Sequence, residues 1–198
     1  ERKKAEHDIK ERVKELNGLY KISEIANQQG TPIETILQEC AEIITAAYQY
    51  PEIACARIQI DGKNFHSTSF GETQWKQRAE IITQGKVIGC VEVFYKEEKP
   101  IEFEGPFLKE ERALIESVAD ILCNSIERKN VEAAIRISEE KYRYLFHNNP
   151  ALIIIWDLQN LKILEVNDKV PELYGYSREE LLNMDVSLLR PKEDQALI

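Results

Sequence analysis

The chain has 198 residues, of which 43% are hydrophobic and 31% are charged, and its formal net charge is −9 at pH 7. This composition is typical of a globular protein with much charged helix surface, and it argues against nucleic-acid binding, which requires clustered Lys and Arg. The four cysteines have no CxxC spacing, and no apolar run is long enough to span a membrane. We therefore expect a cytoplasmic protein with reduced thiols, no membrane segment and no nucleic-acid partner. The only methionine is Met184, so we expect this sequence to be a segment of a longer protein.

Residues 1–29 are predicted to form a helix that stops near Gly30. Its apolar positions recur at spacings of four, three and four residues, the pattern of a coiled-coil seam; they are Ile9, Val13, Leu16 and Tyr20. Thr31 is expected to cap a second helix, which ends before Pro51 because the residue preceding a proline resists helical geometry.

Residues 55–96 carry the alternating pattern of β-strands, with strands predicted at 55–60, 64–70, 77–83 and 87–96. One face of this sheet is expected to be exposed and charged, with cross-strand pairs among Arg57, Arg78, Glu80 and Glu92. Such a face is a poor lining for an apolar pocket. The order helix, helix, antiparallel strands, helix predicts an α+β fold.

Residues 107–146 contain neither Gly nor Pro and are predicted to form one long helix. The first half has a broad apolar stripe from Leu114 to Ile126, which suits packing on a sheet. The second half narrows to a second seam of Val131, Ile135, Ser138, Tyr142 and Leu145. The two stripes are out of phase across residues 127–130, and the alternative is a pair of shorter helices with a turn there.

The sequence shows no catalytic constellation. Three scattered histidines lack metal-ligand spacing, and no phosphate-binding loop or nucleophile motif is present. The carboxylate pairs Glu97-Glu98 and Glu110-Glu111 are expected to be solvated rather than catalytic. Cys55 and Cys90 are expected to be small strand residues without redox activity.

Residues 16–127 resemble a GAF domain in the order and spacing of their elements. The resemblance rests on residues 16–26, on residues 31–48, on the hairpin sequence QGKVIGCVEVFY and on the helix that follows it. It implies a sensory domain whose antiparallel sheet is backed by its first and last helices. Members that hold cyclic nucleotide, haem or bilin use long loops over the other sheet face, and here the connections are short. We therefore expect no bound small molecule on that face.

Residues 138–198 resemble the N-terminal half of a PAS domain. The residues that carry the resemblance are Asn167, the run Gly175 to Leu181 and a closing Pro191-x-x-Asp194, with Ser138 to Phe146 as a lead-in helix. Ser177 and Glu180 have the spacing of a capping box. The resemblance implies Trp156, Asn167 and Tyr174 as candidate cofactor-binding residues, although the cofactor itself is not identified. Alternatively, Trp156 and Tyr174 are core residues, and Asn167 fixes the backbone at the strand-to-helix turn through local side-chain hydrogen bonds.

Together these features predict four segments: a signalling helix over residues 1–15, a GAF-like domain over 16–127, a linker helix over 128–146 and half of a PAS domain over 147–198. The resemblance implies the sensory and relay part of a signalling protein, most like a sensor histidine kinase whose catalytic domains lie outside this sequence. We expect a parallel homodimer along the two seams, with adjacent signalling domains as its other partners. The alternative function is a receptor whose GAF or PAS pocket holds a metabolite or cofactor.

Overall fold

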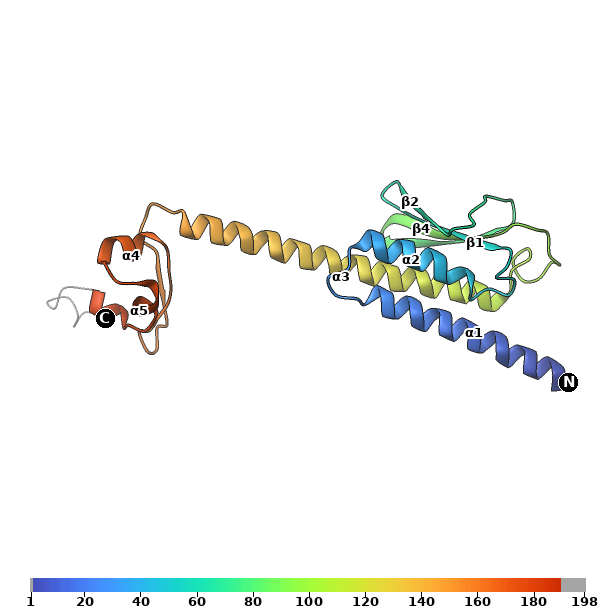
Figure 1. The fold of residues 1–198 in the computed structure, drawn as a ribbon, viewed down its shortest axis with the longest axis horizontal. Coiled ribbons are helices and arrows are strands. Elements are labelled where there is room, and N and C mark those ends of the chain that lie inside the picture. Colours follow the sequence, from blue (N-terminus) through green and yellow to red (C-terminus); the bar gives the residue numbers. More distant parts are fainter. Residues whose placement is uncertain (1, 190–198) are drawn as a thin grey trace. The chain divides into compact units, whose positions relative to one another are not determined.

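The computed structural model describes residues 2–189, and of residues 2–8 and 10 it describes the backbone only (Figure 1). The expected Pro191-x-x-Asp194 ending lies outside these residues. The chain divides into two compact units, Glu1–Val131 and Glu132–Ile198. Helix α3, Lys109–His147, is continuous and contributes residues to both units. The predicted α+β class is confirmed, and the alternative of a turn near residues 127–130 is excluded.

The first unit begins with two helices, α1 (Arg2–Ala26) and α2 (Ile33–Thr45). Helix α1 closely approaches the turn that follows α2 at Gly18, where a Cβ atom would lie 2.5 Å from the Cβ of Ala47. The predicted cap at Thr31 is wrong: Pro32 occupies the cap position, and the Thr31 hydroxyl instead contacts Gln28. Helix α1 also ends four residues before Gly30, because the side chain of Asn27 bonds to the Ser23 carbonyl and closes the last turn.

The sheet of the first unit has four antiparallel strands in the order β2-β1-β4-β3. The strands are β1 (Ala54–Ile60), β2 (Lys63–His66), β3 (Lys76–Thr83) and β4 (Lys86–Tyr95). Tight turns with positive φ at Asp61 and Gln84 join the two hairpins, each with a glycine following. The strand expected over residues 64–70 is shorter, since the chain leaves the sheet after His66.

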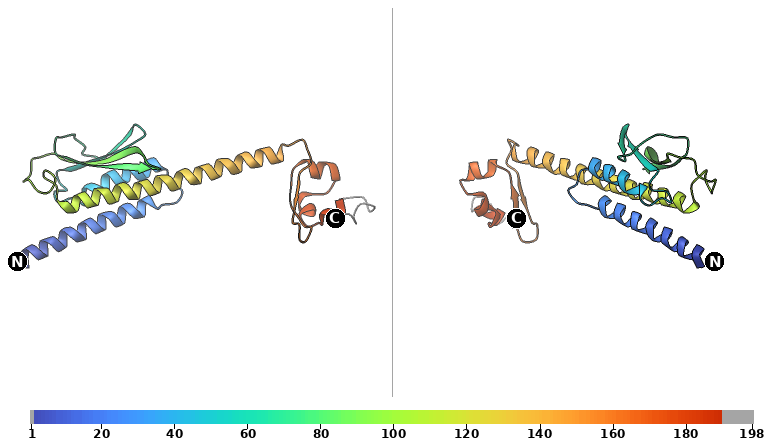
Figure 2. Two further views of the ribbon diagram at one scale, coloured as in Figure 1. Left: turned by 180° about the vertical axis from the view of Figure 1, so that it is seen from behind. Right: turned by 45° about the vertical axis from the view of Figure 1, so that its right-hand side comes forward.

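Helices α2 and the first part of α3 cover one face of this sheet, and α1 lies on their far side (Figures 1 and 2). The core between them is formed by the inward-facing strand residues, including Ile58 and Val91, and by the predicted apolar stripe of α3. Leu114, Ile115, Val118 and Leu122 of that stripe are buried. Burial of this stripe fixes the first part of α3 as a structural element of the sheet domain.

The second unit holds two short strands, β5 (Ile154–Trp156) and β6 (Ile163–Val166), followed by three short helices. These are α4 (Lys169–Tyr174), α5 (Arg178–Leu182) and the 3₁₀ helix η1 (Val186–Leu189). The predicted capping box is present, since the Ser177 side chain accepts from the Glu180 amide and the Glu180 side chain accepts from the Ser177 amide. A small core of Ile163, Val166, Val170, Leu181 and Val186 holds these elements together.

Candidate functional site

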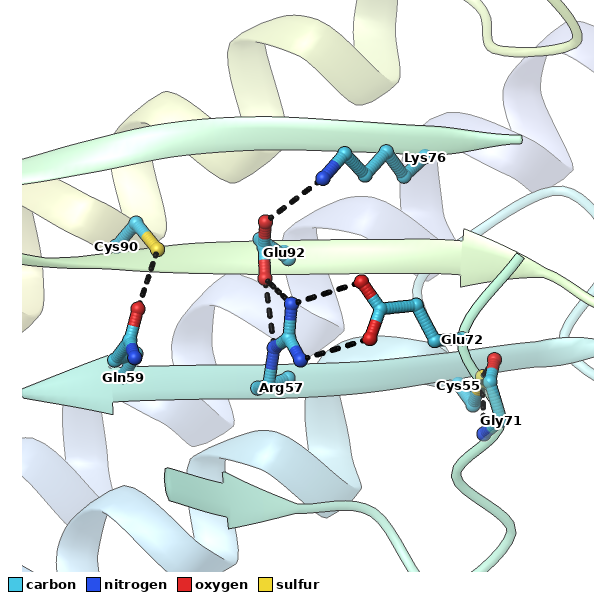
Figure 3. Close-up of polar contacts among 8 residues, drawn as sticks. All are labelled: Cys55, Arg57, Gln59, Gly71, Glu72, Lys76, Cys90 and Glu92. Carbon is cyan, nitrogen blue, oxygen red and sulfur yellow. Dashed lines mark hydrogen bonds and ion pairs between the residues drawn. The ribbon is translucent and has the colours of Figure 1, made fainter. Parts of the chain in front are cut away.

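The sheet face opposite the helices carries a compact cluster of charged side chains (Figure 3). Arg57 on β1 pairs in register with Glu92 on β4, and Arg78 on β3 lies on the other side of Glu92. The Arg57 guanidinium lies 2.6 Å from a Glu92 carboxylate oxygen, and Lys76 reaches the other oxygen at 3.4 Å. The predicted cross-strand charge pairing is therefore observed for Arg57 and Glu92.

The prediction that this face is exposed is wrong for Glu92, which is only 2% exposed. The loop between β2 and β3 folds over it. Phe70 of that loop and Phe94 of β4 each lie within 5.6 Å of the Arg57 guanidinium, and Glu72 of the loop bonds to it. Burial alone would lower the pKa of Arg57, but hydrogen bonds and charge from Glu92 and Glu72 raise it overall. The sequence did not indicate that Phe70 and Glu72 would contact Arg57, because the positions of these residues depend on how the loop between β2 and β3 folds over the sheet.

Two cysteines lie beside this cluster, Cys55 on β1 and Cys90 on β4 (Figure 3). Cys55 is buried and its Sγ lies 3.3 Å from the Gly71 carbonyl, whereas Cys90 contacts the Gln59 side chain. Burial raises the pKa of the Cys90 thiol, and the charge of Glu92 raises it further. A raised pKa disfavours the reactive thiolate. The expectation that Cys55 and Cys90 are small strand residues is met.

A second polar cluster lies where α3 begins, and it overturns the expectation that Glu111 is solvated. Glu111 is fully buried and accepts hydrogen bonds from the Tyr95 hydroxyl and from the amides of Gln49 and Leu108, at 2.6 to 2.7 Å. Burial raises the pKa of Glu111, although these hydrogen bonds oppose the shift. The sequence did contain the signal: Glu111 precedes Ile115 by four residues and so shares its buried helix face.

The two predicted seams are exposed on the described chain. Ile9, Val13, Leu16 and Tyr20 on α1, and Val131, Ile135, Tyr142 and Leu145 on α3, are each between 47% and 71% exposed. A row of exposed apolar side chains on a helix is a feature of surfaces that pack against another helix. Tyr142 also has a partner in its own unit, since its hydroxyl donates to Glu165 at 3.0 Å.

The predicted pocket residues of the second unit lie in different environments. Asn167 is fully buried; its amide donates to the carbonyls of Asn149 and Ala151, and its Oδ1 accepts from the Ile153 amide. These partners lie 14 to 18 residues away, so Asn167 holds the segment before β5 next to the end of β6. The alternative interpretation expected side-chain hydrogen bonds to the backbone, but it wrongly placed them within the local strand-to-helix turn. Trp156 and Tyr174 are 39% and 38% exposed, so the expectation that they are core residues is wrong for the described chain. The two-stranded sheet is too small to bury both faces.

Among the side chains that the structure describes within residues 2–189, no group of three or more His, Cys, Asp and Glu is arranged to hold a metal ion. Nor does this part of the chain include a helix that is long and apolar enough to cross a membrane.

Comparison with known proteins finds a match in the C-terminal part of the chain. Residues 140–198 match the PAS fold. The chain is also 30% identical over 110 residues to the methyl sulfide methyltransferase-associated sensor of Methanosarcina acetivorans. The aligned segment covers 55% of this chain and 10% of that protein. No solved structure matches the chain significantly. A PAS domain is thus found over residues 140–198.

Proposed function

We propose that this chain is a sensory and signal-relay region of a multidomain signalling protein. The observation that carries the proposal is helix α3, which supplies the buried stripe of the sheet domain and continues without a break into the segment that matches the PAS fold. A change in the packing of the first unit would move residues of the same helix that leads into the second. Rigid secondary elements with more than one packing arrangement are the usual carriers of such coupling.

The proposed domain organisation follows the sequence resemblance. Residues 16–127 are a GAF-like sensory domain, a proposal supported by an antiparallel sheet with helices on one face. Those helices are α2 and α3, whereas the resemblance implied the first and last helices; α1 lies on their far side (Figures 1 and 2). Residues 1–15 and 128–146 are the signalling helices on either side of it, and residues 147–198 are half of a PAS domain. The relative from Methanosarcina acetivorans carries the name of a sensor, which agrees with this assignment. For the whole protein we propose a sensor histidine kinase, and autophosphorylation of the complete gene product on histidine tests this.

The relay requires a dimer, and we propose a parallel homodimer along the two exposed seams. Apolar side chains at four- and three-residue spacings pack as knobs into holes when two copies align. Pairing would cover the side chains of both helices that the described chain leaves exposed. Pairing would also fix the rotation of the two α3 helices relative to each other. A signal would be relayed by a change in this relative rotation.

Two single substitutions on α3 test the dimer with matched chemistry. Ile135 is 55% exposed and lies on the seam, whereas Ile137 is 60% exposed and lies on the opposite side of the helix. Burying the exposed half of Ile135 is worth about 1 kcal/mol per chain, so Ile135→Glu should weaken the dimer at least thirtyfold, roughly 2 kcal/mol. Ile137→Glu should leave the dimer nearly unchanged. Sedimentation equilibrium measures both, and an unperturbed chain that stays monomeric at all concentrations would refute the dimeric relay.

A further inference from the structure

A cavity of about 190 Å³ opens at the end of the first unit where α3 leaves the sheet. Its walls come from the start of α2, the turn between β1 and β2, the β3–β4 hairpin and residues Ile126 to Asn130 of α3. The residues of the charged cluster around Arg57 and Glu92 do not line it. The cavity is therefore separate from the sheet face on which the GAF resemblance would place a ligand.

The floor of the cavity is apolar. It consists of Ile33, Leu37, Ile60, Phe65, Ile88 and Ile126. Leu37, Ile60 and Ile126 also belong to the hydrophobic core, so this floor is a rigid part of the domain. A cavity of about 150 Å³ accommodates benzene, so this one suits a partly apolar molecule of roughly six to nine heavy atoms in all.

The rim of the cavity carries charges of both signs. Glu34 and Lys63 lie 3.3 Å apart and neutralise each other. Lys129 contacts only the backbone carbonyl of Gln28, at 3.3 Å, and Asp61 at the β-turn forms no ion pair with any described residue. The rim therefore offers one ammonium group and one carboxylate that lack partners of opposite charge.

We propose that this cavity binds a small apolar amino acid, with its side chain on the floor and its zwitterionic head between Lys129 and Asp61. A ligand with both charges satisfies both rim groups, whereas a simple acid or amine satisfies one and desolvates the other. The bound molecule would touch Ile126, Lys129 and Asn130, which are the last residues of α3 in the first unit. The bound amino acid would be the signal that the proposed relay transmits, so this inference rests on the proposed function.

Three ligands of matched shape test the charge requirement: L-leucine, 4-methylpentanoate, which lacks the amino group, and 3-methylbutylamine, which lacks the carboxylate. Isothermal titration calorimetry on the full 198-residue chain should show leucine binding at least tenfold more tightly than either analogue, because each lost charged contact is worth about a factor of ten or more. Amide chemical-shift changes in the same titration should map to the residues that line the cavity.

Two conservative variants test the residues. Lys129→Gln and Asp61→Asn should each weaken leucine binding about tenfold. Asn is chosen at position 61 because this residue has φ of 48°, which asparagine adopts readily. Lys109→Gln, at an exposed position at the start of α3, is the matched control and should bind leucine as the unmodified chain does.

Any one of three results would overturn the proposal. The first is no leucine binding at about 10 mM, which would mean a Kd too weak for a specific site. The others are equal affinity for leucine and an analogue, and amide chemical-shift changes confined to the strands around Arg57. These readouts are independent of the relay. If the chain dimerises through α3 but does not bind leucine, only the proposed cavity site is refuted. If the chain is monomeric and binds leucine, only the proposed relay is refuted.

Discussion

Replacement of Glu111 with Leu should destabilise the first unit by about 4 kcal/mol. The substitution removes the acceptor that, among the described residues, alone serves three donors: the Tyr95 hydroxyl, which is fully buried, and the amides of Gln49 and Leu108, which are partly buried. An unpaired donor lowers the free energy of unfolding by about 2 kcal/mol when it is fully buried and by about 1 kcal/mol when it is partly buried. One fully buried and two partly buried donors therefore give about 4 kcal/mol. Glu110→Leu is the matched control, because Glu110 is the exposed neighbour and should change stability by about 0.5 kcal/mol or less.

Urea denaturation followed by tryptophan fluorescence measures the effect. Trp75 lies in the first unit and Trp156 in the second, so a Trp156→Phe background makes the signal report the first unit alone. A loss of about 1 kcal/mol or less for Glu111→Leu would refute the claim that this carboxylate organises the start of α3.

The same residue predicts a pH dependence. Burial raises the pKa of Glu111 in the folded state above its ordinary value near 4.5, so between the two values the folded chain binds more protons than the unfolded chain. Stability from this group is therefore greatest at low pH and falls as the pH rises through that window. Glu111→Gln should remove this part of the slope, and denaturation at a series of pH values from about 4 upward measures it. An unchanged slope in the variant would contradict the assignment.

Two further perturbations test the packing of the first unit. Arg57→Leu should lower the free energy of unfolding by about 3 kcal/mol, because it leaves the buried Glu92 with only Lys76 as an ion-pair partner. The double variant Arg57→Leu/Glu92→Leu should unfold with a free energy within about 1 kcal/mol of that of the unmodified chain. A double variant as unstable as the single one would contradict the pairing. Gly18→Ala should destabilise by about 1 kcal/mol, since the clash with Ala47 outweighs the gain in helix propensity, and Gly18→Ala/Ala47→Gly should recover the loss. Thermal unfolding measures this pair, and a Gly18→Ala variant more stable than the original would show that α1 is not closely packed against Ala47.

Much of the local structure could be predicted from residue patterns. The strands, their alternation, the capping box at Ser177 and the long helix from residue 109 to 147 all follow from periodicity and turn chemistry, because these are properties of neighbouring residues. The GAF-like assignment of residues 16–127 and the dimer seams stay predictions. The PAS resemblance of the last sixty residues is supported by a family match over residues 140–198.

The errors about charged residues arose where distant segments meet, whereas the wrong cap at Thr31 was a local error. Glu111 and Glu92 were both expected to be exposed to solvent. The fold brings the Tyr95 hydroxyl and the Gln49 amide to Glu111. It brings the Arg57 guanidinium to Glu92. The cavity beside Lys129 likewise joins four elements that are separated along the chain.

The sequence by itself determined which segments are helix and strand and which faces of them are apolar, because periodicity is encoded in residues a few positions apart. The tertiary structure alone decided which partners the buried charges receive and which charges are left at the rim of the cavity. Burial depends on the segments that fold over a side chain, and the free energy of a charge depends on the partners that they supply.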